Sequence, residues 1–198
     1  VLIPRPETEE LVAWILEDLQ STALQPDFSL IDIGTGSGCI PVSLKMKNPS
    51  AKITATDISP QALHVATENA KLHDVEINFL ETSILNHTIS PIKYDIIVSN
   101  PPYIPLSDAG GMSANVINHE PHLALFVPDD DPLFFYKAIC EFATQHLKMN
   151  GLLYFEINPP AAEQLVEYLK TSGFGKVISR NDLSGHTRFI RASQMKVK

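Results

Sequence analysis

Alternation between short buried strands and helices is the feature that most restricts how this chain can fold. Several runs rich in β-branched residues lack helical spacing, which is typical of strands buried in a sheet. We expect strands at residues 29–33, 52–56, 76–80, 96–98, 152–157, 174–180 and 186–192, and helices at residues 6–19, 38–47, 60–73, 133–147 and 162–172. Because strands and helices alternate until the last two strands, the sequence predicts an α/β fold with a doubly wound, mostly parallel seven-stranded sheet and an antiparallel edge hairpin.

Length and composition indicate one globular domain. A chain of 198 residues can bury a single sizeable core. Its 44% hydrophobic and 19% charged residues are typical of a folded rather than a disordered chain. No apolar run reaches the roughly 18–20 residues of a membrane span, and the N-terminus does not resemble a signal peptide. Cys39 and Cys140 are expected to be reduced thiols, so we expect a cytoplasmic, monomeric protein without membrane contact.

The net charge of −8 argues against broad binding to nucleic acid, because such binding depends on many Lys and Arg contacts with phosphates. We therefore expect no direct contact with nucleic acid. The sequence begins at Val1, inside a stretch that looks functional, so we expect residues 1–198 to be one domain of a longer protein.

A glycine-rich turn joins the strand at residues 29–33 to the following helix. It consists of Gly34, Thr35, Gly36, Ser37 and Gly38. Glycines allow the backbone to approach a ligand closely, and free N–H groups at the start of a helix can face that ligand. The dinucleotide fingerprint Gly-x-Gly-x-x-Gly is absent, because the third glycine comes one residue early and Cys39 stands where the fingerprint requires glycine. A nicotinamide dehydrogenase is therefore the weakest interpretation.

Two further residues could complete a ligand site beside this turn. Asp57 ends the second sheet strand about 20 residues after the glycines, where an acid can bind both hydroxyls of a ribose. The ordinary alternative is that Asp57 caps the next turn, but Ser59 is a better candidate for that role. Ile84 lies in the loop after the third strand and could cover one face of an adenine ring.

The strongest candidate for chemistry is the sequence Asn100-Pro101-Pro102-Tyr103 after the fourth strand. The prolines end the strand because they cannot donate ladder hydrogen bonds, and Pro101 favours an extended conformation at Asn100. A side-chain amide, carbonyl oxygens and an aromatic ring then stand at the carboxyl edge of the sheet, where ligands of open α/β folds bind. These groups suit a planar NH2 group, whose two hydrogens need acceptors. A tight strand exit with Tyr103 as packing explains the four residues alone about equally well.

Residues 105–132 form a segment too long for a simple connection. His119, Glu120 and His122 suggest a metal site, but no third well-spaced ligand follows, so we expect no metal. A loop over the active site is the better interpretation, with Glu120 and Pro121 shaping a pocket wall. At the other end of the chain, Arg5, Glu7 and Thr8 could simply form the solvated first turn of a helix.

Taken together, these motifs resemble the peptide chain release factor N5-glutamine methyltransferases, a family of S-adenosylmethionine-dependent enzymes with a Rossmann-like fold. The strand, Asp-x-Gly-x-Gly-x-Gly turn and helix at residues 29–47 are similar to the first motif of such methyltransferases. The resemblance covers essentially the whole chain and is carried by residues 4–9, 32–38, 57–60, 100–103, 120–125 and 182–185. Two departures from the family are visible. Ser83 and Ile84 stand where an acid and an aromatic residue are usual, and the family's N-terminal helical domain is absent from residues 1–198.

This resemblance implies methyl transfer from S-adenosylmethionine to the side-chain amide nitrogen of the glutamine in a Gly-Gly-Gln motif. The protein partner would be a release factor. Cofactor contacts are implied for the turn at residues 34–38, Asp57, Ile58, Ile84 and Asn100. The substrate glutamine would lie on Asn100, Pro101, Pro102 and Tyr103, with further substrate contacts from Arg5, Glu7, Thr8, Glu120 and Pro121. Asn100, Pro101 and Tyr103 are the expected catalytic residues.

Two other functions compete with this interpretation. The same four residues would suit an enzyme that methylates an exocyclic amine of adenine or guanine, since the target is again a planar NH2 group. The acidic composition and the lack of an obvious target-recognition domain argue against it. A module that binds S-adenosylmethionine without catalysis is the second alternative, but such a module needs no acceptor groups like those of residues 100–103.

Overall fold

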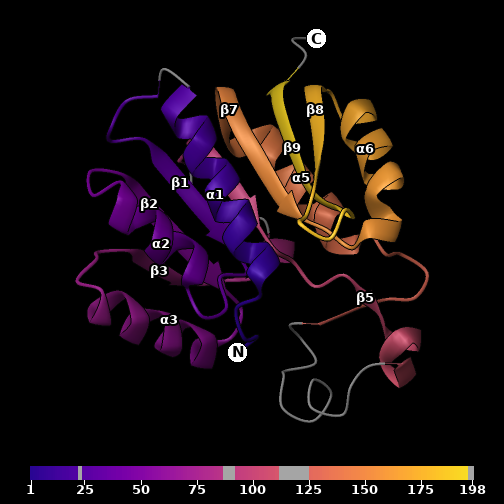
Figure 1. The fold of residues 1–198 in the computed structure, drawn as a ribbon, viewed down its shortest axis with the longest axis horizontal. Coiled ribbons are helices and arrows are strands. Elements are labelled where there is room, and N and C mark those ends of the chain that lie inside the picture. The colour runs from indigo at the N-terminus through magenta and orange to yellow at the C-terminus, as the bar shows by residue number, and fades with distance from the viewer. Residues whose placement is uncertain (22–23, 87–91, 112–124, 196–198) are drawn as a thin grey trace.

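A computed structural model describes residues 1–21, 24–86, 92–111 and 125–195. Its centre is a seven-stranded sheet with the strand order β3-β2-β1-β4-β7-β9-β8 (Figure 1). The strands are β1 (Ser29–Ile33), β2 (Lys52–Asp57), β3 (Asn78–Glu81), β4 (Tyr94–Ser99), β7 (Leu147–Glu156), β8 (Phe174–Asn181) and β9 (Thr187–Met195). All neighbouring pairs are parallel except β7 with β9 and β8 with β9. The predicted fold is therefore confirmed.

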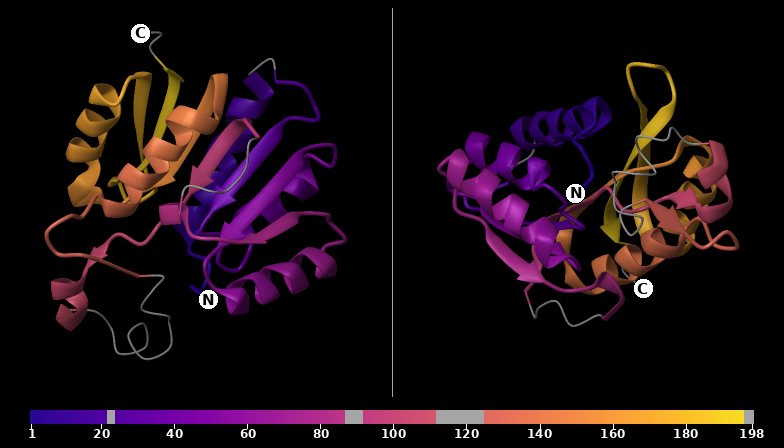
Figure 2. Two further views of the ribbon diagram at one scale, coloured as in Figure 1. Left: turned by 180° about the vertical axis from the view of Figure 1, so that it is seen from behind. Right: turned by 90° about the horizontal axis from the view of Figure 1, so that it is seen from below.

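Helices cover both faces of the sheet, so its central strands are buried on both sides. One core lies under α1 (Pro6–Ser21) and α2 (Cys39–Lys47), where Leu11 and Ile15 meet Leu30, Ile96 and Tyr154. The second core lies on the opposite face under α5 (Phe134–His146) and α6 (Ala162–Thr171). Figure 2 shows the second face from behind. Helix α3 (Pro60–Leu72) lies beside α2 and presents small residues, Ala62, Ala66 and Ala70, to the interior.

Several details differ from the expectation. Strand β7 begins at Leu147 instead of residue 152, with a register shift in its pairing to β4 between Tyr94 and Ile96. Asn150 has a φ of 66° within this irregular stretch, which no alternation pattern reveals. A separate pair, β5 (Ile104–Pro105) and β6 (Phe126–Val127), also lies within the segment that we expected to be a loop.

The strand order reverses direction between β1 and β4, as it does in doubly wound sheets. Strands β2 and β3 lie on one side of β1, whereas β4 and β7 follow on the other. Ligands of such folds bind beyond the carboxyl ends of the strands at this switch point. The start of the chain lies at the same edge of the sheet (Figure 1). Among the described residues, no helix combines the length and apolar character required to cross a membrane.

Candidate active site

The glycine turn after β1 is held against β2 and opens toward solvent on its other side. The N–H groups of Gly34 and Thr35 both donate to the Thr56 carbonyl, at 2.9 and 2.8 Å. Gly38 has a φ of 78°, and a Cβ atom there would lie 2.9 Å from Ala66 Cβ, so only glycine allows α2 and α3 to approach this closely. The first N–H groups of α2 are consequently presented at the switch point.

Asp57 fixes the shape of this turn from the end of β2. Its Oδ2 accepts a hydrogen bond from Gly36 N at 2.9 Å, and its Oδ1 accepts one from Ser59 N, also at 2.9 Å. Ser59 itself caps α3 by accepting from Ala62 N. Asp57 therefore stands beside the glycines, as the sequence predicted, and its carboxylate oxygens retain lone pairs for further donors.

Asp32 and Thr35 are unusual because their polar atoms are buried without partners. Neither carboxylate oxygen of Asp32, nor Thr35 Oγ1, has a hydrogen-bond partner within the described ranges. Burial raises the pKa of Asp32 to about 7. The Thr35 hydroxyl opposes this increase although it makes no hydrogen bond of good geometry, and the nearby Asp57 carboxylate adds to the increase. Unpaired buried polar atoms cost free energy unless a ligand supplies the missing partners. A cation with N–H donors would satisfy Asp32.

The two isoleucines expected near an adenine ring lie in different environments. Ile84 begins a 3-10 helix (Ile84–Asn86) and packs into the core under α5 with only 8% of its surface exposed. Ile58 is 57% exposed, directly after Asp57. An apolar side chain that protrudes beside a polar turn is available to a ligand, whereas Ile84 offers only its small exposed part. Their contacts with a cofactor stay predictions.

The sequence from Asn100 to Tyr103 follows β4 as expected. Ser99 is fully buried and donates from its hydroxyl to the Ile33 carbonyl at 2.6 Å, which ties the ends of β4 and β1 together. Pro101 is buried, whereas Asn100 and Tyr103 are partly buried. Tyr103 packs against the core under α5, and burial raises its pKa to about 12, so its phenol remains protonated.

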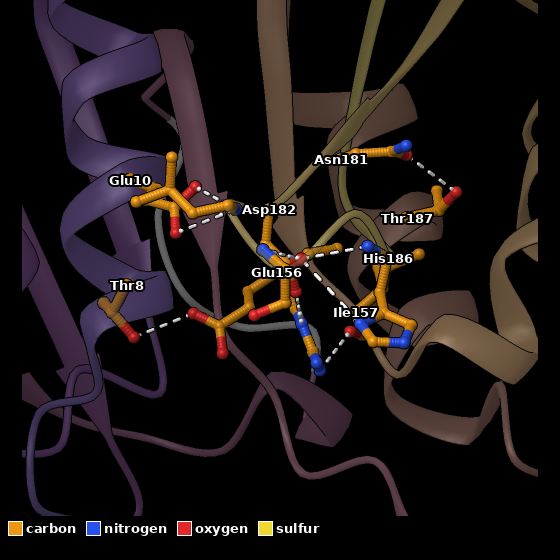
Figure 3. Close-up of polar contacts among 11 residues, drawn as sticks. Thr8, Glu10, Glu156, Ile157, Asn181, Asp182, His186 and Thr187 are labelled. Atoms are coloured by element: carbon orange, nitrogen blue, oxygen red, sulfur yellow. Dashed lines mark hydrogen bonds and ion pairs between the residues drawn. The ribbon is translucent and has the colours of Figure 1, made fainter.

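A buried carboxylate that the sequence analysis did not identify lies beside Asn100. Glu156 ends β7 and is only 2% exposed. Its Oε2 accepts a hydrogen bond from Thr8 Oγ1 at 2.8 Å (Figure 3). Asn100 Nδ2 lies 3.4 Å from the same Thr8 oxygen. Burial raises the pKa of Glu156, while hydrogen bonds from Thr8 and Asn100 and the positive charge of Arg188 oppose this increase. In the sequence, the only indication of a role for Glu156 was that an acid ends an otherwise apolar strand.

The turn between β8 and β9 lies next to this carboxylate. Asp182 accepts hydrogen bonds from the backbone N–H groups of Ser184 and His186, and its second oxygen accepts one from Arg188 Nε at 3.2 Å. Arg188 also donates to the Ile157 carbonyl at 3.3 Å, so it is held close to the neighbouring Glu156. Glu10 of α1 accepts from Leu183 N at 3.1 Å. The turn is therefore fixed on both sides.

The remaining predicted residues fall into two groups. Arg5 and Glu7 lie near Tyr103, because their charges act on its pKa in opposite directions. Thr8 is 5% exposed, and its hydroxyl donates to Glu156 inside the protein. Glu120 and Pro121 lie outside the described residues. No cluster of potential metal ligands was found in the part of the chain that the structure describes.

Comparison with known proteins gives three results. Residues 13–123 match the family model described as the methyltransferase small domain. The release factor glutamine methyltransferases of Flavobacterium psychrophilum and Bacteroides thetaiotaomicron are 45% and 42% identical to this chain over 97% and 98% of its length. The chain covers 67% and 68% of these relatives, about two thirds of each.

Among solved structures, the hMettl16 catalytic domain in complex with the MAT2A 3'UTR hairpin 1 is similar with a TM-score of 0.71. Its sequence identity is 22%, over 97% of this chain and 71% of the other. A ribosomal protein L11 methylase from Lactobacillus delbrueckii has a TM-score of 0.64 at 20% identity, over 98% of this chain and 81% of the other. At this level of identity, both structures support the fold alone.

Proposed function

This chain belongs to the family of release factor glutamine methyltransferases, and from this premise we propose that it methylates the glutamine side chain of a Gly-Gly-Gln motif in a peptide chain release factor. The acceptor is the amide nitrogen (N5), and the methyl donor is S-adenosylmethionine. The observation that carries this proposal is the position of Asn100, Pro101, Pro102 and Tyr103, which follow β4 at the switch point beside the glycine turn.

The residues around the turn fit S-adenosylmethionine. This cofactor carries a positively charged amino group with N–H donors, and Asp32 is a buried carboxylate without described partners. In this proposal the turn residues Gly34, Thr35, Gly36, Ser37 and Gly38 surround the amino-acid part of the cofactor. Asp57 binds the ribose hydroxyls, Ile58 and Ile84 contact the adenine, and Asn100 borders the reactive end. When bound, the cofactor supplies a methyl group on a sulfonium, which needs no metal to be transferred.

The target nitrogen is a weak nucleophile, so its position decides the rate. The lone pair of an amide nitrogen is delocalised into the carbonyl. Asn100 Oδ1 and the Pro101 carbonyl accept its two hydrogens and fix the nitrogen for in-line attack. These acceptors bind more strongly as the nitrogen gains positive character, and this difference between ground state and transition state lowers the barrier. Tyr103 and Pro102 pack against the glutamine side chain and exclude water.

No general base is required for this arrangement. The nitrogen loses a proton only after it has gained the methyl group and become strongly acidic. The phenol of Tyr103 is protonated because burial raises its pKa to about 12. It therefore acts through packing and hydrogen bonding, not as a base.

The wider assignments follow from this reaction. Residues 1–198 form the methyltransferase domain, and the helical domain typical of the family would precede them in a longer chain. In this proposal Arg5 and Glu7 border the substrate segment, with Thr8 behind them. Glu120 and Pro121 stay predicted substrate contacts. The substrate is a translation factor, which assigns the reaction to the cytoplasm, and the reaction itself requires only one copy of this chain.

The direct test is mass spectrometry of a release factor after incubation with this protein and S-adenosylmethionine, with adenine-containing DNA treated in parallel. We expect one added methyl group, which fragmentation of the peptide assigns to the glutamine of Gly-Gly-Gln. Methylation of the DNA alone would instead support transfer to an exocyclic amine. Cofactor binding without methylation of either substrate, by the chain with its preceding domain included, would contradict the proposal.

A further inference from the structure

Three residues from distant parts of the chain form a directed series of hydrogen bonds behind the substrate position. Thr8 lies in the first turns of α1, Asn100 follows β4, and Glu156 ends β7. Thr8 Oγ1 donates to Glu156 Oε2 at 2.8 Å, and Asn100 Nδ2 donates to Thr8 Oγ1 at 3.4 Å. The series therefore runs from the Asn100 amide through the Thr8 hydroxyl to the Glu156 carboxylate, and the Asn100 side chain also hydrogen-bonds to that carboxylate directly.

The direction of this series is determined by its end. A carboxylate can only accept hydrogen bonds, and a threonine hydroxyl has one proton to donate. Once that proton is donated to Glu156, Thr8 can only accept from its other neighbour. The neighbour must then present N–H groups, so the Asn100 amide has its nitrogen toward Thr8. Because nitrogen and oxygen lie on different sides of a planar amide, Oδ1 is directed away from Thr8.

The opposite side of the Asn100 amide is available for a substrate. Nothing in the described ranges donates a hydrogen bond to Asn100 Oδ1, and Asn100 is only partly buried. Thr8 and Glu156, in contrast, are 5% and 2% exposed and are engaged inside the protein. They are therefore better suited to orient a neighbour than to contact a substrate.

We propose that Glu156 and Thr8 are positioning residues that fix the Asn100 amide with Oδ1 toward the substrate nitrogen. This inference rests on the proposed function, since it explains which end of Asn100 meets the glutamine. An amide that rotates by 180° about its last bond would present N–H donors to the NH2 group of the substrate. Such a contact is repulsive, and the acceptor needed in the transition state is lost.

Charge strengthens this arrangement. A charged acceptor makes shorter and stronger hydrogen bonds than a neutral one. Arg188 opposes the effect of burial on Glu156. Arg188 Nε donates to Asp182 Oδ2 at 3.2 Å. The buried carboxylate therefore has a cation nearby but retains Thr8 as its close donor. The Glu7 charge acts in the opposite sense.

The test uses two variants that interrupt the series without removing Asn100. Thr8→Val retains the shape of the side chain but removes the hydroxyl. Glu156→Gln retains the size of the side chain but removes the charge and adds N–H donors. The Thr8 hydroxyl is then no longer bound to donate toward residue 156, so the direction of the series is no longer fixed. For both variants we expect kcat for methylation of the release factor to fall about 10- to 100-fold. The KM for the release factor and the Kd for S-adenosylmethionine should change by less than about threefold, because neither binding surface is altered.

Three controls separate positioning from a general structural role. Thr8→Ser restores the hydroxyl, and we expect kcat within about threefold of the unmodified protein. Thr144→Val removes a similar hydroxyl that donates to the Glu141 carbonyl on the exposed side of α5, and it should leave kcat unchanged. The double variant Thr8→Val with Glu156→Gln should be about as slow as either single variant, because both interrupt the same series.

The outcomes distinguish this inference from the proposed function. If the unmodified protein, with its preceding domain included, does not methylate the release factor, the proposed function fails. If it does and Thr8→Val retains full kcat, the positioning role is wrong. Multiplicative losses in the double variant, or equal losses in Thr8→Ser and Thr8→Val, would indicate a structural connection between α1 and β7 instead. Should Thr8→Val or Glu156→Gln unfold, Thr8→Ser still tests the contact. We expect the Asn100 side-chain NH2 signals of ¹⁵N-labelled Thr8→Ser to match those of the unmodified protein, and shifted signals together with full kcat would contradict the positioning role.

Discussion

The two halves of the candidate site differ in how their buried polar groups are satisfied. Beyond β1 and β2, Asp32 and Thr35 are buried without described partners. Beyond β4 and β7, Thr8, Asn100 and Glu156 are hydrogen-bonded to one another. Both halves contain a buried acid with a raised pKa. Thr8 donates to Glu156 at 2.8 Å, whereas the neighbouring Thr35 hydroxyl lowers the pKa of Asp32 without forming a hydrogen bond of good geometry.

This difference indicates that the two halves serve different purposes, ligand binding in the first and the reaction in the second. A buried acid without a partner favours any ligand that brings the missing charge and donors, so the first half gains stability when the cofactor binds. An acid with an internal partner is already in its final arrangement, so the second half needs no reorganisation during the reaction. We therefore expect changes in the first half to affect mainly affinity and changes in the second half to affect mainly rate.

The largest effect is expected for Asn100→Ala, which removes an acceptor from the second half. We expect kcat to fall about 10²- to 10³-fold, the usual loss when one preorganised group at a transition state is removed. The Kd for S-adenosylmethionine, measured by titration calorimetry, should change far less. Equal losses in rate and affinity would mean that Asn100 serves the cofactor, and the distinction between the two halves would then be lost.

Asp32→Asn should have the opposite profile. Removing the negative charge should weaken S-adenosylmethionine binding about 10- to 100-fold, the range for a hydrogen bond to a charged group. The same variant should raise the melting temperature of the cofactor-free protein at pH 7, because a neutral amide costs less to bury than a carboxylate. A variant that binds the cofactor normally would show that Asp32 is not the partner of its amino group.

Gly38→Ala tests the shape of the first half. The added Cβ would lie 2.9 Å from Ala66 Cβ, and alanine is strained at a φ of 78°. We expect the free energy of unfolding to decrease by about 1–3 kcal/mol and cofactor affinity to decrease with it. Denaturant unfolding measures the first quantity. A variant of normal stability would show that α2 and α3 can separate without cost.

The last prediction concerns pH. The pKa of Asp32 in the folded protein is about 7, above its ordinary value of 3.8. Between these values the unfolded chain has lost this proton while the folded protein retains it, so stability contributed by Asp32 falls as the pH rises from about 4 to about 7. Asp57, Thr35 and Cys39 surround Asp32, and of these Asp57 strengthens the trend. The melting temperatures of the unmodified protein and Asp32→Asn should diverge across this range and run parallel above it.

Local sequence patterns predicted most of the fold and the glycine turn of the first half, but not a role for Asp32. Strands β1, β2 and β4 follow from their β-branched runs, and the turn at residues 34–38 follows from its glycines. The position of Asn100 follows from the two prolines after it. Each of these features depends on neighbours within a few residues, which a sequence displays directly.

Partners from distant segments could not be predicted in this way. Glu156 and Thr8 are separated by 148 residues, and only the folded sheet brings them together. Glu156 stood at the end of a predicted strand, yet nothing in its own segment indicated a hydroxyl partner. The early start of β7 was missed for a similar reason, since Leu147 pairs with Tyr94 across a register shift.

The hydrogen bonds of α1 have a consequence for how an active molecule is made. Besides Thr8, this helix contacts the last third of the chain through Glu10 with Leu183 and through Glu17 with Arg180, at sequence separations of 173 and 163 residues. Contacts of such high order form late, because a long loop must close first. A chain that is still being synthesised can shape the glycine turn and the β1–β2 edge long before Glu156 reaches Thr8. Methyl transfer by the proposed arrangement therefore depends on the first helix meeting the end of the sheet, so turnover requires contacts between the two ends of the chain.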